Sequence, residues 1–226
     1  AVAPYVVGVK LQLAYFETLG ADGIRAFEET SDYARAANLL VLADGKRGDI
    51  GSTARAYADA YLEKCEDRPP PVDALTVNPY LGSDSIEPFV AACRRTGNGI
   101  FCLVKTSNAG SADIQDAALS DGRPLWHHVA ELVDVWGEEL VGERGLSSVG
   151  AVVGAAVLEA LGSMAGSFFR SGMRFPPLRA LDTAGGLVLG DNAYLFGELL
   201  EDSDGGRAMR GFHELGPTKG LITVAG

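Results

Sequence analysis

The residues best suited to chemistry lie in one short, highly charged stretch. An apolar run over residues 39–43 leads directly into Asp44, and Lys46, Arg47 and Asp49 follow within five positions. Asp44 and Lys46 are two residues apart, so on an extended backbone their side chains point to the same side. In parallel α/β folds, chemistry is located at the carboxyl ends of strands. The pattern therefore predicts a carboxylate–ammonium pair in a ligand site, with a solvated charged loop as the alternative.

Two further apolar runs, residues 5–10 and 99–105, also close on a lysine. The second is followed by a polar loop over residues 106–110, in which Ser107 either hydrogen-bonds a ligand or forms a simple turn. The formal net charge of the chain is -11, so an anionic substrate would need a locally positive site. The cations that are candidates to supply it are Lys10, Lys46, Arg47 and Lys105.

Composition argues against several classes of protein. A net charge of -11 disfavours nucleic acid and anionic membrane as main partners. The three cysteines form no Cys-x-x-Cys pair and are odd in number, which indicates a reducing, cytoplasmic setting. The three histidines lack metal-ligand spacing, so no metal site is predicted. No apolar run reaches transmembrane length, no signal peptide is visible, and the chain begins without methionine, which indicates a trimmed N-terminus.

Strand-like and helix-like segments alternate along the chain. β-branched and apolar runs predict strands over residues 5–10, 39–43, 73–77, 99–105, 149–154, 185–190 and 220–226. Apolar residues at helical spacing predict helices over residues 21–37, 52–64, 83–95 and 123–140. Ser52 or Thr53 is expected to cap the second helix. The alternation predicts a parallel sheet with right-handed crossovers. A (β/α)8 barrel and a doubly wound sheet both fit, although the chain lacks the glycine-rich dinucleotide fingerprint.

The charged stretch resembles a family signature. It reads Asp44-x-Lys46-x-x-Asp49-Ile50-Gly51-x-Thr53 and is similar to the signature of orotidine 5'-monophosphate decarboxylases, in the spelling of the bacterial branch often called type 2. The resemblance covers residues 1–154 and implies that residues 1–226 form one (β/α)8 TIM-type barrel domain. The family's first strand is not visible upstream of Ala1, and the last third departs from the family pattern. We therefore expect a barrel that is incomplete at its N-terminus and irregular in its C-terminal third.

The resemblance implies decarboxylation of orotidine 5'-monophosphate to UMP, a step of de novo pyrimidine biosynthesis, without metal or organic cofactor. Lys46 would stabilise a carbanion at pyrimidine C6 and then donate the proton to it. Asp44 would hold Lys46, and Lys10 would bridge Asp44 and the substrate. Asp49 would reach into the partner's site of a homodimer and complete a Lys-Asp-Lys-Asp array, in which alternating charges offset each other's desolvation.

Two substrate contacts follow from the same resemblance. Thr53 would contact the nucleotide from the partner subunit, and Ser107 would contact the pyrimidine. The last third of this sequence contains no recognisable match to the family's phosphate-binding loop or to its final arginine. The residues that could replace them are Arg170, Arg174 and Arg179.

Two other functions remain open at the level of the sequence. A magnesium-dependent phosphosugar lyase or decarboxylase on the same barrel uses a similar Asp-x-Lys-x-x-Asp strand end, but Lys10 and Gly51-x-Thr53 argue against it. A catalytically impaired barrel that binds a nucleotide is favoured by the unrecognised last third. Magnesium dependence, or tight binding without turnover, would distinguish these functions from the decarboxylase.

Overall fold

The computed structural model describes residues 6–63, 69–142, 147–154, 187–189, 192–195 and 220–224. Side chains are described over residues 8–63, 69–142 and 147–154. No helix within these ranges is both long enough and apolar enough to span a membrane.

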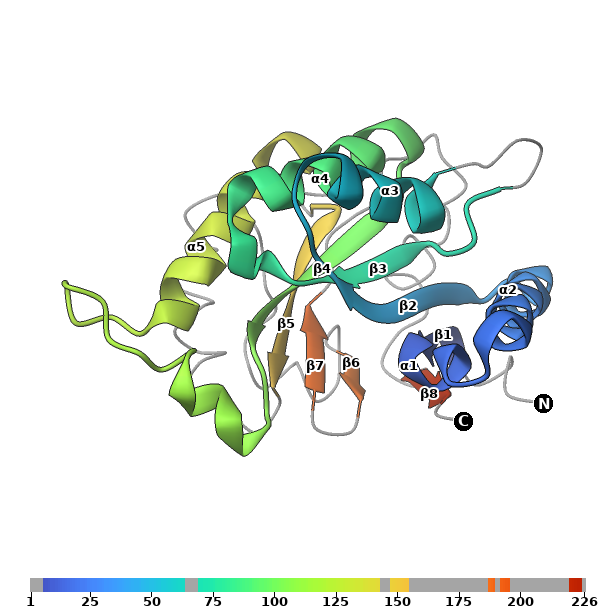
Figure 1. Ribbon diagram of the computed structural model, residues 1–226, viewed down its shortest axis with the longest axis horizontal. Helices are drawn as coiled ribbons and strands as arrows, with labels where there is room; N and C mark the ends of the chain where they lie inside the picture. The colour runs from blue at the N-terminus through green and yellow to red at the C-terminus, as the bar shows by residue number, and fades with distance from the viewer. Residues whose placement is uncertain are drawn as a thin grey trace.

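In the described residues, a single sheet carries the fold, and from β1 to β5 strands that follow one another along the chain pair in space (Figure 1). Its parallel wall consists of β1 (Val6–Gln12), β2 (Leu40–Arg47), β3 (Ala74–Val77), β4 (Gly99–Lys105) and β5 (Val149–Gly154). A doubly wound sheet reverses its strand order at a switch point, whereas the order β1 to β5 runs without reversal. The order therefore favours a barrel wall over an open Rossmann-type sheet.

The last third of the chain breaks the βα repeat. β6 (Leu187–Leu189) and β7 (Asn192–Leu195) pair antiparallel, and β7 also lies antiparallel to β5. β8 (Gly220–Val224) returns to the parallel direction beside β1. β6 and β8 stand at opposite ends of the strand order, yet Cα atoms of the two come within 8 Å. The sheet therefore curls into most of a barrel, and the expected irregularity of the last third is confirmed.

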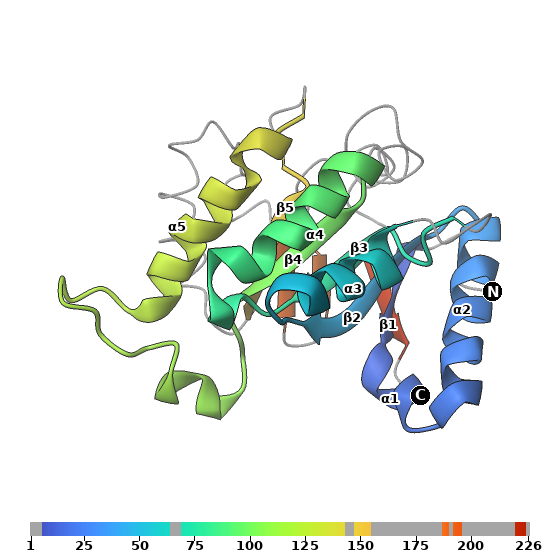
Figure 2. The same ribbon diagram turned by 45° about the horizontal axis from the view of Figure 1, so that its top comes forward.

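The helices connect the parallel strands and cover one face of the sheet. They are α1 (Leu13–Glu17), α2 (Gly20–Ala36), α3 (Gly51–Leu62), α4 (Ser83–Thr96) and α5 (Leu125–Gly137), with short 3-10 turns η1 (Pro79–Leu81), η2 (Ala109–Asp113) and η3 (Glu138–Leu140). α3, α4 and α5 lie side by side on that face (Figure 2). The core fills the space between sheet and helices, where Leu11, Val41 and Ile100 pack in one cluster with Phe27 and Phe89.

One local prediction was wrong. Neither Ser52 nor Thr53 caps α3, because the helix begins one residue earlier, at Gly51, and its N-cap position is Ile50. Gly51 has a φ of +52°, a backbone conformation that glycine adopts without steric penalty. Ser52 and Thr53 consequently lie inside the first turn, where their hydroxyls no longer occupy the capping position.

Candidate active site

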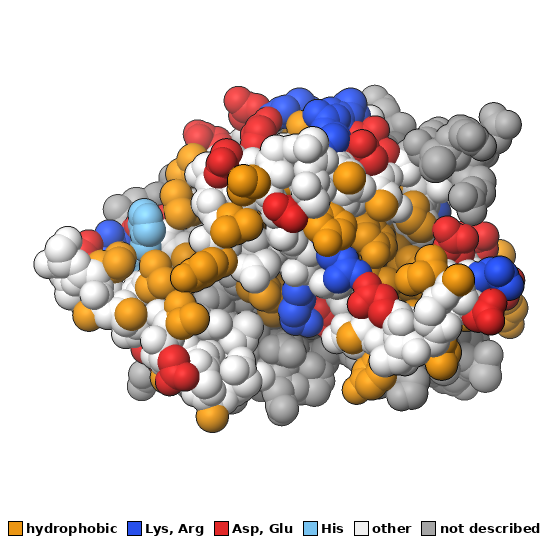
Figure 3. Space-filling view, viewed as in Figure 1, with side chains coloured by type: hydrophobic (Ala, Val, Ile, Leu, Met, Phe, Trp, Pro, Cys, Tyr) orange, Lys and Arg blue, Asp and Glu red, His pale blue; other side chains and the backbone are white. Residues whose placement is uncertain are grey.

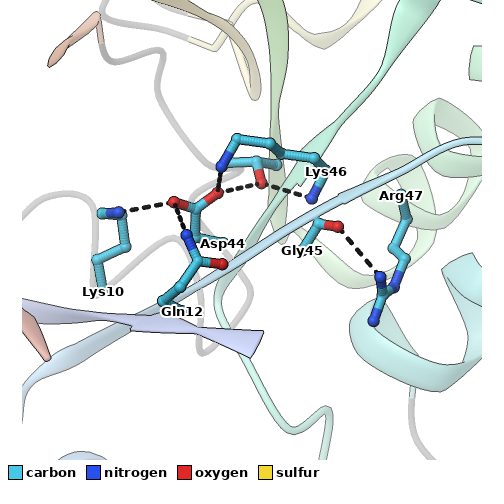
Figure 4. A network of polar contacts seen from close by, with 7 residues as sticks. Lys10, Gln12, Asp44, Gly45, Lys46 and Arg47 are labelled. Carbon is cyan, nitrogen blue, oxygen red and sulfur yellow. Dashed lines mark hydrogen bonds and ion pairs between the residues drawn. The ribbon is translucent and has the colours of Figure 1, made fainter. Parts of the chain in front are cut away.

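A buried carboxylate is the centre of the site. The side chain of Asp44 is 3% exposed and accepts hydrogen bonds on both oxygens (Figure 4). Oδ2 accepts from Lys10 Nζ at 2.7 Å and from Gln12 Nε2 at 3.1 Å. Oδ1 accepts from Lys46 Nζ at 2.5 Å and from the Thr76 hydroxyl at 3.0 Å. Four donors, two of them cationic, therefore compensate the burial of this one negative charge.

The sheet register brings these residues together. Gln12 of β1 lies opposite Asp44 of β2, and Lys10 precedes Gln12 by two residues on the same face. The β2–β3 register shifts between Ala43 and Arg47, and within this interruption Lys46 adopts a φ of +46°. Three adjacent strands thus bring their polar side chains together on the face of the sheet opposite the described helices α1–α5.

A pocket of about 210 Å³ opens beside this cluster. Its lining combines the charged pair with a polar loop after β4 and two apolar side chains. The lining residues are Asp44, Lys46, Thr76, Leu103, Thr106, Ser107, Asn108 and Val152. The predicted ligand contact Ser107 therefore lies in the same pocket as Lys46. The Lys46 side chain is 46% exposed, so its ammonium is held by Asp44 while remaining accessible from the pocket.

Two predicted site residues lie apart from this cluster. Among the described residues, the Asp49 carboxylate accepts from the backbone N–H of Ile50 at 2.8 Å and forms no ion pair with Lys10 or Lys46. Thr53 is exposed in the first turn of α3 and is not part of the pocket lining. Within one copy of the chain, neither residue reaches the pocket.

Two of the four candidate cations point elsewhere. Arg47 points away from Asp44 and donates to the Gly45 carbonyl (Figure 4). It also pairs with Glu17 of α1 and lies over the rings of Tyr57 and Tyr61 in α3. Lys105 is 6% exposed and bonds Asp116 at 2.8 Å and Ser111 at 3.1 Å. Arg47 and Lys105 are therefore wrong as candidates to supply positive charge to the ligand site. Within the described part of the chain, Lys46 lines the pocket and Lys10 lies beside it on Asp44.

Sequence reasoning missed Thr76 altogether and treated Gln12 only as part of the family match. Thr76 is the one polar side chain in β3, whose sequence is Ala-Leu-Thr-Val. A lone hydroxyl within an apolar strand next to the strand that ends in Asp44 was a signal that could have identified it. The proposed phosphate ligands Arg170, Arg174 and Arg179 lie outside the described residues.

The electrostatics of Asp44 give a pH prediction. Burial alone would raise the pKa of this carboxyl, but hydrogen bonds and charges from Lys10 and Lys46 outweigh it and hold the pKa below the ordinary 3.8. The ionised group therefore stabilises the fold fully above pH 3.8, and this contribution is lost as the pH falls through the lower folded pKa. In urea unfolding, the stability gap between wild type and Asp44→Asn should stay constant from about pH 5 to 7 and shrink below about pH 3.8. A gap that grows on acidification would contradict the ionised assignment.

The packing of the Ser107 loop gives a second prediction. A Cβ added to Gly154 at the end of β5 would lie 2.9 Å from the Ser107 backbone nitrogen and 3.0 Å from its Cα. Gly154→Ala should therefore displace the loop and destabilise the protein by about 1–3 kcal/mol. Gly110→Ala in the neighbouring turn is the matched control, because its Cβ would meet nothing closer than 3.6 Å. Equal melting temperatures for the two variants would show that the loop is not pressed against β5.

Comparison with the sequences of known proteins supports the family that the charged stretch indicates. Residues 1–189 match the model of the "Orotidine 5'-phosphate decarboxylase / HUMPS family". An orotidine 5'-phosphate decarboxylase from Rhodopirellula baltica is 52% identical over 163 residues, which are 71% of this chain and 54% of that protein. One from Deinococcus radiodurans is 48% identical over 155 residues, 69% of this chain and 54% of that protein. The chain thus spans about half the length of the curated relatives it matches.

Solved structures agree with the sequence comparison. A Streptomyces avermitilis structure assigned to orotidine 5'-phosphate decarboxylase superposes with a TM-score of 0.62 at 44% identity, covering 69% of this chain and 53% of that one. The structure of the OMP decarboxylase of Leishmania donovani superposes with a TM-score of 0.61 at 35% identity. The match covers 73% of this chain and 59% of that one. This family folds as a (β/α)8 barrel, so the predicted fold class is confirmed, with the described residues forming part of such a barrel. Since the family model covers residues 1–189 of 226, the chain belongs to the orotidine 5'-phosphate decarboxylase / HUMPS family.

Proposed function

We propose that this protein decarboxylates orotidine 5'-monophosphate to UMP in pyrimidine biosynthesis, acting as a lyase without metal or organic cofactor. The observation that carries the proposal is the buried Asp44 carboxylate held between two ammonium groups, with Lys46 facing a pocket that also contains Ser107. The relatives named orotidine 5'-phosphate decarboxylase support the choice of substrate. We further propose that residues 1–226 act as one cytoplasmic barrel domain.

The reaction requires a cation close to pyrimidine C6. When the C6–carboxylate bond breaks, CO2 leaves and the electron pair stays on C6 as a carbanion. The Lys46 ammonium stabilises this charge most strongly where water is excluded and the cation is already in place. Lys46 then transfers a proton to C6, which gives UMP, and the neutral amine takes a new proton from solvent. Asp44 holds the Lys46 ammonium in position before the bond breaks, and Lys10 holds the other oxygen of Asp44.

The donor set of Asp44 argues against the magnesium-dependent phosphosugar enzymes. In those enzymes the first acidic residue of the motif helps to hold the metal. Here both oxygens of that residue are occupied, Oδ2 by Lys10 and Gln12 and Oδ1 by Lys46 and Thr76. A divalent cation at this carboxylate would have to displace an ammonium at 2.5 or 2.7 Å and stand beside the other one. We therefore do not favour this alternative.

A homodimer would complete the site. Asp49 and Thr53 lie outside the pocket of their own chain, so we propose that both act on the substrate bound by the partner subunit. Their surroundings support an interface, because Ile50, Tyr80 and Leu81 are 55%, 74% and 49% exposed. Apolar side chains also gather on the face of the molecule seen in Figure 3. Exposed large apolar residues grouped in this way are typical of protein contacts.

The direct test follows the loss of orotidine 5'-monophosphate absorbance with purified protein in the presence of EDTA. We expect turnover that EDTA does not reduce. Activity that appears only with magnesium and a sugar phosphate would contradict the proposal in favour of the phosphosugar enzymes. Tight UMP binding without turnover by a folded dimer would instead identify the chain as a catalytically impaired nucleotide-binding barrel.

A further inference from the structure

Thr76 is a fully buried hydroxyl in the middle of a short apolar strand. Its exposed fraction is 0%, and its neighbours in β3 are Leu75 and Val77, which are equally buried. A buried hydroxyl without hydrogen-bond partners would be strongly unfavourable, and valine would fill the same β-branched shape without that penalty. Threonine is therefore preferable to valine at this position only because of the hydrogen bonds that its hydroxyl forms.

The Thr76 hydroxyl is linked to both the backbone amide and the side-chain ammonium of Lys46. Thr76 Oγ1 accepts a hydrogen bond from the backbone N–H of Lys46 at 2.9 Å. It donates to Oδ1 of Asp44 at 3.0 Å, and the same Oδ1 accepts from Lys46 Nζ at 2.5 Å. One hydroxyl consequently fixes the main chain of Lys46 directly and its ammonium through a shared carboxylate oxygen.

Lys46 needs such support because its backbone is in an unusual conformation. Its φ is +46°, in the left-handed region that residues other than glycine seldom occupy. It also lies where the register between β2 and β3 is interrupted, so the regular ladder does not define its position. Its long side chain is 46% exposed, and it would lose rotamer freedom on being held in one arrangement.

We propose that Thr76 is a positioning residue that sets the location of the Lys46 ammonium relative to the substrate. The inference rests on the proposed decarboxylase function. Thr76 acts in two ways: it holds the left-handed turn of the main chain at Lys46, and it orients the Asp44 oxygen that receives Nζ. The hydroxyl takes no part in proton transfer, and the chemistry stays with Lys46.

The kinetic test compares Thr76→Val, which removes the hydroxyl but keeps the shape, with Thr76→Ser, which keeps the hydroxyl. We expect Thr76→Val to lower kcat about 10- to 100-fold with little change in KM, and Thr76→Ser to restore most of the rate. Thr96→Val is the matched control, because the Thr96 hydroxyl likewise donates one hydrogen bond, to the Ala92 carbonyl, and accepts one from a backbone N–H, that of Asn98. An unchanged kcat in Thr76→Val, a loss that serine does not restore, or an equal loss in Thr96→Val would overturn the inference.

A second readout does not depend on turnover. Hydrogen exchange of the Lys46 backbone amide, followed by NMR, should be at least about tenfold faster in Thr76→Val than in wild type and near wild type in Thr76→Ser. Unchanged exchange overturns the inference, whatever the kinetics. If wild type fails to convert orotidine 5'-monophosphate, the proposed function fails, and faster exchange in Thr76→Val would still support Thr76 as the residue that holds Lys46.

Discussion

Replacement of Lys46 by alanine should lower the turnover of orotidine 5'-monophosphate by at least about 10⁴-fold. Loss of a positioned proton donor lowers a rate by about 10²–10⁴-fold, and loss of one preorganised electrostatic contact by about 10²–10³-fold. Lys46 supplies both in the proposed mechanism, so the two losses combine. The measurement is kcat from the decrease in substrate absorbance, with circular dichroism to show that the variant is folded.

The fold should survive this change for a structural reason. Lys46 is 46% exposed, and Asp44 would keep its bonds from Lys10, Gln12 and Thr76. Arg25→Ala is a suitable control, because it also removes one cation, from an exposed pair with Asp22 on α2. That control should retain full activity. Substantial decarboxylation by Lys46→Ala would show that another group protonates C6.

Replacement of Asp44 by asparagine should destabilise the protein by about 3 kcal/mol, besides lowering activity. The change removes the negative charge from a side chain that is 3% exposed and lies 2.7 Å from the Lys10 ammonium. Lys10 is itself 6% exposed, so solvent replaces the lost interaction poorly. The free energy of unfolding from urea titration at neutral pH provides the measurement.

A double variant separates lost charge pairing from lost packing. Lys10→Met together with Asp44→Asn should be more stable than Asp44→Asn alone by at least about 1 kcal/mol, because the buried cation is removed as well. Asp22→Asn, in the exposed pair with Arg25 in the first turn of α2, should cost no more than about 1 kcal/mol and serves as the surface control. If the double variant is no more stable than the single one, the pairing of Lys10 with Asp44 is not what stabilises this region.

The sequence by itself determined the five parallel strands, the four longer helices and the chemical centre of this protein, but not the short helix α1 or the strand β7. The strands ending near Lys10, Asp44 and Lys105 were predictable because β-branched apolar runs have few other ways to bury their side chains. The Asp44-x-Lys46 pair was predictable because two residues on one strand stay close in any fold. The antiparallel pairing of β6 and β7 in the last third was not predictable, since no regular period marks those residues.

Only the tertiary structure decided which charged groups meet. The directions of Arg47 and Lys105 depend on the partners that helices and loops bring to them, Glu17 in one case and Asp116 in the other. Thr76 joins Lys46 and Asp44 because β3 pairs with β2 in a shifted register. The two contacts of Thr76 join residues 30 and 32 positions apart and depend on strand register, in which a shift of one residue turns every side chain to the opposite face. The local sequence pattern did not reveal the shifted register between β2 and β3, so the part that Thr76 plays in the site could be established only from the folded sheet.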